Sequence, residues 1–233
     1  MGTILWFADH GIVGIDKGDR GMSTTERPKG ISPFSTDASR VEAFSDGVMA
    51  VIITIMVLGL KPPSGTSLAS LQSIAPTFAA YVLSFVFIGI YWNNHHHMMR
   101  AAETIDGRAM WANLHLLFWL SLIPFTTSWL GKNPTAAIPT ALYASLLLLD
   151  ALGYRLLQNA LVAVNGRGTA FAKAVESDLK GKASLAIYIC AIGLAFLAPF
   201  ISDVLFVVVA AMWVVPDRRL ERVIVQRKDE GMI

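Results

Sequence analysis

Charged residues and cysteines are both scarce in this sequence. Only 15% of the residues are Asp, Glu, Lys or Arg, whereas 54% are hydrophobic, and the mean hydropathy is +0.53. A single soluble core does not absorb so large a share of apolar side chains. The formal net charge of +2, with basic residues dispersed along the chain, argues against nucleic acid binding. We therefore expect membrane lipid to be the main surroundings of the chain.

Several features that mark other classes of protein are missing. Cys190 is the only cysteine, so no intrachain disulfide is expected. Asp9, His10 and Asp16 interrupt the apolar stretches at the amino terminus, so no cleaved targeting segment is expected. Glycine-rich phosphate loops and nucleophile motifs are absent, so we expect neither an enzyme nor a bound cofactor or metal.

The two ends of the chain differ in composition from its middle. Residues 1–38 are rich in glycine, proline and scattered charge, which predicts a poorly ordered tail. Met22 is an alternative start of the chain. Residues 39–217 are predicted to form the membrane domain, and residues 218–233 a basic tail. We expect both tails to lie in the cytoplasm.

Six apolar stretches predict an all-α membrane protein with six transmembrane helices. A helix needs roughly 20 residues to cross about 30 Å of hydrocarbon. Pro124 predicts a kink within the third stretch, and Pro199 predicts a turn that divides the last one. The expected spans are 41–60, 70–94, 110–130 and 135–160, followed by two short helices within 183–215.

The distribution of Lys and Arg supports six spans. With six spans, 17 of the 19 basic residues lie on one side, and only Lys61 and Lys132 lie on the other. The positive-inside rule then places both chain ends in the cytoplasm. If residues 183–215 formed one long helix, the five basic residues near the carboxyl end would lie outside, which the rule disfavours.

The first span begins with polar residues that a membrane helix rarely carries. Arg40, Glu42, Ser45 and Asp46 lie near its cytoplasmic end, where ionisable groups are costly unless they are paired or hydrated. Arg40 and Glu42 can also extend to the lipid headgroups. Asp46 lies about one turn deeper, which favours hydrogen bonds to a neighbouring helix.

Helical geometry separates the first span into two faces at 100° per residue. One face is apolar apart from a single hydroxyl, while Ser45 and Asp46 point to the other side. From periodicity alone, lipid contact or ordinary helix packing is the preferred explanation of such an apolar face. The residues within an arc of roughly 100° are Phe44, Gly47, Val51, Thr54, Ile55 and Leu58.

Residues 40–46 resemble a family signature. Their sequence, RVEAFSD, fits the R-x-x-x-F-S-D motif of the transmembrane protein 175 family of potassium channels. The resemblance continues through the YWNNHH end of the second span, Asn113 in the third and the Ile-Pro-Phe sequence that begins at Ile123. It covers the chain from Arg40 to the end of the sixth span.

The resemblance implies a potassium channel in a bacterial-type plasma membrane. Family members with one six-span repeat form homotetramers, in which the first helix of each subunit lines a pore without a carbonyl filter. Transferred by its spacing from the motif, the constriction falls on Val51, followed by Thr54, Ile55 and Leu58. The family usually has Ile or Leu at the narrowest point, so the smaller Val51 leaves the preference for potassium over sodium open.

The resemblance also implies a polar network that holds the pore helix. Its expected members are the motif residues and polar residues at the ends of the next two spans. They are Arg40, Phe44, Ser45, Asp46, Trp92, His95, His96 and Asn113.

The residues also suggest two other functions, a metal site and a proton-coupled transporter. Consecutive side chains of a helix diverge by about 100°, so His95, His96 and His97 do not converge easily on one metal ion. A proton-coupled transporter would use Asp46 or Asp150, since carboxylates within spans often carry protons. The alternative for Asp150 is a hydrogen bond to a neighbouring helix, assisted by Tyr154.

Overall fold

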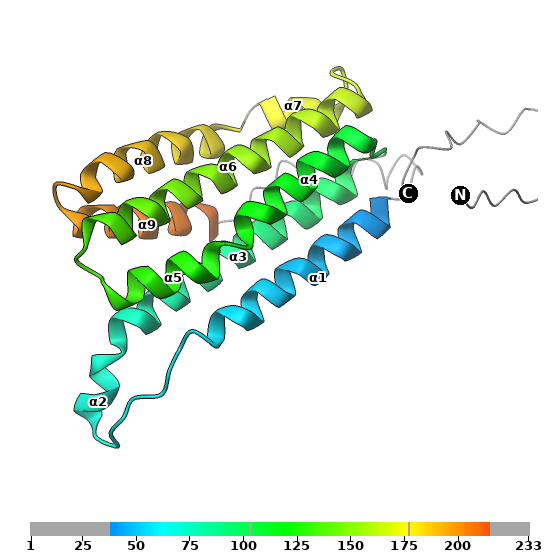
Figure 1. The fold of residues 1–233 in the computed structure, drawn as a ribbon. Helices are drawn as coiled ribbons and strands as arrows, with labels where there is room; N and C mark the ends of the chain where they lie inside the picture. Colours follow the sequence, from blue (N-terminus) through cyan, green and yellow to red (C-terminus); the bar gives the residue numbers. More distant parts are fainter. Residues whose placement is uncertain (1–37, 103, 177, 215–233) are drawn as a thin grey trace, which may run out of the picture. The chain divides into compact units, whose positions relative to one another are not determined.

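The fold is a bundle of helices, seen in Figure 1. A computed structural model describes residues 38–102, 104–176 and 178–214. All regular elements in these residues are helical. They are α1 (Ala38–Val57), α2 (Leu68–Ser73), α3 (Ala75–Ala101), α4 (Gly107–Leu120), α5 (Ile123–Lys132), α6 (Ala137–Asn165), α7 (Ala170–Glu176), α8 (Leu179–Ala195) and α9 (Pro199–Val214).

Both predicted proline breaks are confirmed. The third predicted span is divided into α4 and α5 by a turn at Ser121 and Leu122, and Pro124 lies in the first turn of α5. The last apolar region is divided at residues 196–198, and Pro199 is the first residue of α9. A proline is tolerated at both places because the first amides of a helix have no partner within the helix.

Some predicted boundaries were wrong. The second span was expected to end at Asn94, but α3 continues to Ala101 and includes the three consecutive histidines. The polar residues do not stop the helix because His95 and Asn94 form hydrogen bonds within the protein. The short helices α2 and α7 were not predicted, and α1 ends at Val57, three residues early. Apart from Ala38, the predicted tail 1–38 lies outside the described residues, as does 218–233.

Within the residues that the structure describes, three helical stretches are long and apolar enough to cross a membrane. They are α3, the consecutive pair α4 and α5, and α6, with lengths of 27, 26 and 29 residues. The shorter α9 is also strongly apolar. In α1, the 20 residues reach about 30 Å, but three of them are charged. The chain is therefore a helical membrane protein, while the count of six spans and the side of each chain end stay predictions.

The pore-helix candidate α1 packs at one edge of the bundle. It contacts α3, α4 and α5, while α6, α8 and α9 pack together on the other side of α3 and α5 (Figure 1). The side chains that α1 buries recur every three or four residues, which is the spacing of one helix face. They are Val41, Ser45, Met49, Ile52 and Met56.

Close packing holds together α3 and α5, two of the helices that α1 contacts. The Thr77 hydroxyl donates a hydrogen bond of 3.0 Å to the Gly131 carbonyl. Further along, the Thr127 hydroxyl donates to Ser84 Oγ at 2.7 Å, and Ser84 Oγ lies 2.8 Å from Tyr143 Oη of α6. A Cβ atom at Gly131 would lie 2.7 Å from Thr77 Cα, so only glycine allows this approach.

We expect Gly131→Ala to destabilise the bundle by about 1–3 kcal/mol, because the added methyl group meets backbone rather than a flexible side chain. The measurement is the thermal unfolding midpoint of the purified protein in detergent. The matched control is Gly89→Ala, where an added Cβ meets nothing within 4 Å. An equal effect of the two substitutions would contradict the close-packing argument.

Candidate functional site

The two faces of α1 differ in the structure as helical geometry predicted. Val51 and Phe44 are each 54% exposed, Ile55 is 51% exposed and Leu58 is 77% exposed. The Thr54 side chain lies on the same face and donates a hydrogen bond of 2.9 Å to the Val51 carbonyl. An exposed, mainly apolar strip therefore runs along α1 outside its buried face, and its two ends border grooves beside α4 and α5.

A buried chain of hydrogen bonds joins α1 to α4 and α3. The Asn113 amide group donates to Ser45 Oγ at 2.9 Å, and its Oδ1 atom lies 2.8 Å from His95 Nε2. Because Oδ1 only accepts, the geometry assigns the proton of that pair to His95 Nε2. The Ser45 hydroxyl donates in turn to the Val41 carbonyl at 2.8 Å. Ser45, His95 and Asn113 are all fully or almost fully buried.

The start of α4 positions Asn113 for these contacts. Asp106 caps the helix, and its carboxylate accepts a hydrogen bond of 2.9 Å from the Ala109 amide. Such a cap satisfies one of the free amides at a helix start and fixes where the helix begins. Asn113 then lies less than two turns further, on the buried side of α4.

A second polar cluster lies beside the first, between α1 and α3. Glu42 Oε1 and His96 Nδ1 are 2.6 Å apart, and the Trp92 ring stacks on the His96 ring with centroids 6.0 Å apart. Asp46 belongs to the same cluster, because its carboxylate, the Glu42 carboxylate and a His96 nitrogen lie within 4.8 Å of one another. Glu42 is therefore paired within the protein rather than extended to lipid headgroups.

The structure thus brings together most, but not all, of the predicted network. Ser45, His95 and Asn113 form one cluster, and Asp46, Trp92 and His96 contribute to the other. Arg40 and Phe44 are exposed and line a groove beside Asn113 instead of joining the hydrogen bonds. Glu42 was missed as a site residue, although its spacing of four residues from Asp46 places both carboxylates on one face of the helix.

Asp150 in α6 is fully buried. The hydrogen bond that was expected from a neighbouring helix is absent, since neither carboxylate oxygen has a hydrogen-bond partner among the described residues. Tyr154, one turn later, donates to the Asn94 carbonyl at 3.2 Å. This contact links α6 to the helix that carries His95 and His96.

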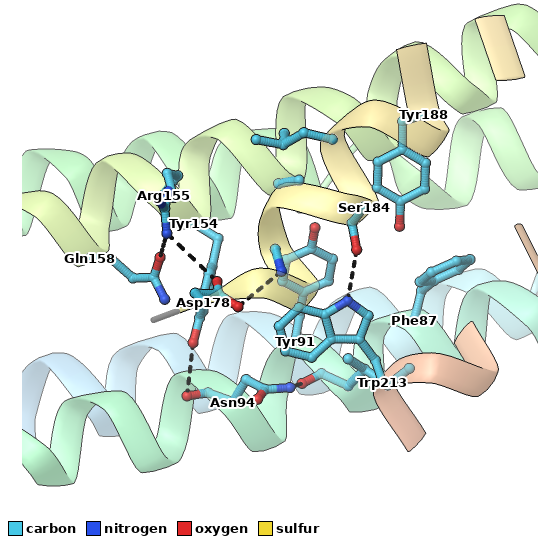
Figure 2. Close-up of a pocket in the computed structure, with 14 residues that line it drawn as sticks. Phe87, Tyr91, Asn94, Tyr154, Arg155, Gln158, Asp178, Ser184, Tyr188 and Trp213 are labelled. Carbon is cyan, nitrogen blue, oxygen red and sulfur yellow. Dashed lines mark hydrogen bonds and ion pairs between the residues drawn. The ribbon is translucent and has the colours of Figure 1, made fainter. Parts of the chain in front are cut away.

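Figure 2 shows a crevice between α3, α6, α8 and α9. Its lining includes an Arg155–Asp178 ion pair of 3.7 Å, and the Trp213 indole donates to Ser184 Oγ at 2.9 Å. The cavity measures about 40 Å³, which holds only a few water molecules. The crevice therefore fits solvent rather than a substrate.

Comparison with known proteins identifies the family. The model of the family described as endosomal/lysosomal potassium channel TMEM175 matches residues 40–124. A protein of Chryseobacterium, named as a potassium channel, is 46% identical over 183 residues, which cover 78% of this chain and 95% of that protein. The chain belongs to the TMEM175 family.

Two further TMEM175 proteins are similar to this chain. The crystal structure of a lysosomal potassium-selective channel TMEM175 homolog from Chamaesiphon minutus superposes with a TM-score of 0.66 at 27% identity. It covers 76% of this chain and 96% of that chain. The rat protein, named as an endosomal/lysosomal proton channel, is 34% identical over 110 residues, or 37% of this chain and 22% of that protein. The resemblance predicted from residues 40–46 is confirmed.

We expect Asn113→Ala to lower the stability of the protein by about 1–3 kcal/mol, because it leaves His95 Nε2 unpaired and removes the donor to Ser45 Oγ. The measurement is the unfolding midpoint in detergent, together with the oligomer peak in size-exclusion chromatography. Asn133→Ala is the control, since the Asn133 side chain is exposed and donates a hydrogen bond to the nearby Trp129 carbonyl of α5; its effect should stay within about 0.5 kcal/mol. Equal effects of Asn113→Ala and Asn133→Ala would show that the buried hydrogen bonds do not stabilise the protein more than an exposed one does.

Proposed function

We propose that this TMEM175 protein is the subunit of a homotetrameric, potassium-preferring channel in the plasma membrane, with α1 of each subunit lining the pore. The observation that carries the proposal is the exposed apolar strip of α1, which includes Val51, Thr54, Ile55 and Leu58. The names of the Chryseobacterium and Chamaesiphon relatives support potassium as the permeant ion.

The chemistry of the strip fits a narrow ion path that also gates. Four Val51 side chains around an axis would form an apolar ring, and such a ring blocks ions when it dewets. Thr54 would form the next ring. Its hydroxyl hydrogen is engaged by the Val51 carbonyl, so the oxygen lone pairs remain available to a cation. Exchange of hydration water for hydroxyl oxygens costs least for a weakly hydrated ion such as potassium.

The polar clusters support this function through position rather than through contact with ions. The side chains of Ser45 and Asp46 leave α1 on the side away from the strip, toward α3 and α4. They thereby fix the rotation of α1 about its own axis. A rotation of one residue, about 100°, would remove Val51 from the pore axis.

We expect Val51→Ser and Leu58→Ser to raise potassium flux into liposomes by at least about threefold, because a hydroxyl lowers the cost of wetting an apolar constriction. Flux is measured with a potassium gradient and a fluorescent indicator. The control is Val207→Ser, at an equally exposed valine on α9, which should leave flux unchanged.

The experiment has two outcomes that contradict the proposal. One is the absence of potassium flux from a correctly reconstituted tetramer. The other is an equal change of flux for Val207→Ser and Val51→Ser, since the proposal gives a pore position only to Val51.

A proton-coupled transporter is the second candidate, and the buried carboxyl group of Asp150, which has no hydrogen-bond partner among the described residues, favours it. Asp150→Asn keeps the shape of the side chain and removes its ability to carry a proton. The channel proposal expects potassium flux within about twofold of wild type, because Asp150 lies on α6, away from the α1 strip. Loss of flux that a pH gradient drives in wild type, in a normally assembled variant, would instead support the transporter.

A further inference from the structure

Two carboxylates and one imidazole lie together at the start of α1. Neither the pore nor the anchoring of α1 requires this combination of side chains. Glu42 and Asp46 lie one turn apart on α1, and His96 faces them from α3. One carboxylate oxygen of each acid and one nitrogen of the imidazole all lie within 4.8 Å of one another. The Asp46 Oδ1 atom is buried and has no hydrogen-bond partner among the described residues.

Two carboxylate oxygens and one imidazole nitrogen form a donor set for divalent transition metals. Such ions bind nitrogen and oxygen ligands at about 2.0–2.2 Å, which separates neighbouring ligand atoms by about 3–4 Å. To bind an ion, Glu42 Oε1 and His96 Nδ1, now 2.6 Å apart, would move slightly apart. The two ligand atoms that are farthest from each other would move slightly closer. Small side-chain rotations are therefore enough, and the helices need not move.

The surroundings favour the same interpretation. The side chains of His96 and Glu42 are 31% and 19% exposed, so the group lies near the protein surface, while the His96 Nδ1 atom itself is buried. The stacked Trp92 ring holds the imidazole plane. Arg40 lies about 200° around α1 from Glu42, so its positive charge does not point at the group. His95 is engaged by Asn113, and His96 is the histidine that lies beside the two carboxylates.

We propose that Glu42, Asp46 and His96 bind one divalent transition-metal ion per subunit and thereby tie α1 to α3. The remaining coordination positions are filled by water. The ion joins the start of α1 to its neighbour by bonds that are stronger and more directional than the present ion pair. The bound ion restrains α1 and thereby lowers the potassium flux; this consequence rests on the proposed channel function.

The binding test uses the full-length protein, purified without a polyhistidine tag and freed of metal by a chelator. Titration with Co²⁺ should give visible absorption bands of cobalt with bound nitrogen and oxygen ligands, saturating at one ion per chain, and Zn²⁺ should displace them. His96→Gln and Glu42→Gln should each weaken binding by at least about tenfold. His115→Gln is the matched control, since His115 lies on α4 and accepts a hydrogen bond from Trp119.

Two results would overturn the metal site: no saturable Co²⁺ signal from the wild type, or equal binding by the His96→Gln and His115→Gln proteins. A second measurement guards against a variant that merely folds poorly. Zn²⁺ should raise the unfolding midpoint of the wild type and of His115→Gln, but not that of His96→Gln. A rise in all three proteins would also contradict the site.

A separate flux experiment distinguishes the two proposals. The ratio of potassium flux with and without Zn²⁺ should fall below about one half for the wild type and stay near one for His96→Gln. If metal binds but no potassium flux exists, the channel proposal fails and the site stands. If flux exists but cobalt does not bind, the site fails and the channel stands.

Discussion

The arrangement of α1 depends on one interaction, the buried hydrogen-bond chain from Ser45 through Asn113 to His95. Polar groups buried among apolar side chains are costly unless they are paired, and here each bond satisfies two of them. The geometry of such bonds is directional, whereas apolar contacts allow a helix to slide and rotate. Asn113 therefore determines the rotation of α1, and that rotation determines which side chains form the exposed strip.

The rest of the α1 interface is of a different kind. Beyond Ser45, the buried face consists of Met49, Ile52 and Met56. Methionine side chains adapt to irregular gaps and tolerate displacement. One end of α1 is thus held by directional bonds and the other by adaptable apolar contacts. A helix anchored in this way resists rotation at its polar end while its apolar end accommodates shifts at little cost.

Much of this could be predicted from the sequence because it follows from local geometry. The breaks at Pro124 and Pro199 follow from the missing amide hydrogen of proline, and the two faces of α1 follow from 100° per residue. The end of α3 could not be predicted, because the polar sequence NNHHH is typical of the membrane–water interface. His95 stays within the buried part of α3 because Asn113, on another helix, provides its partner. Glu42 was missed because its partner His96 lies on another helix, and Arg40, which was expected in the network, is exposed in the structure. That Asp150 has no hydrogen-bond partner among the described residues likewise follows only from the three-dimensional arrangement.

The two polar clusters divide the three consecutive histidines between two tasks. A helix directs neighbouring side chains about 100° apart, so His95 and His96 cannot serve one site. His95 points into the protein and completes the buried hydrogen bonds, while His96 remains partly exposed beside two carboxylates. Burial makes the first contact costly to break, and exposure leaves the second free to exchange partners with solvent. The buried cluster of Ser45, His95 and Asn113 therefore holds α1 at all times. Solvent and ions outside the protein can act on α1 through the partly exposed cluster of Glu42, Asp46 and His96.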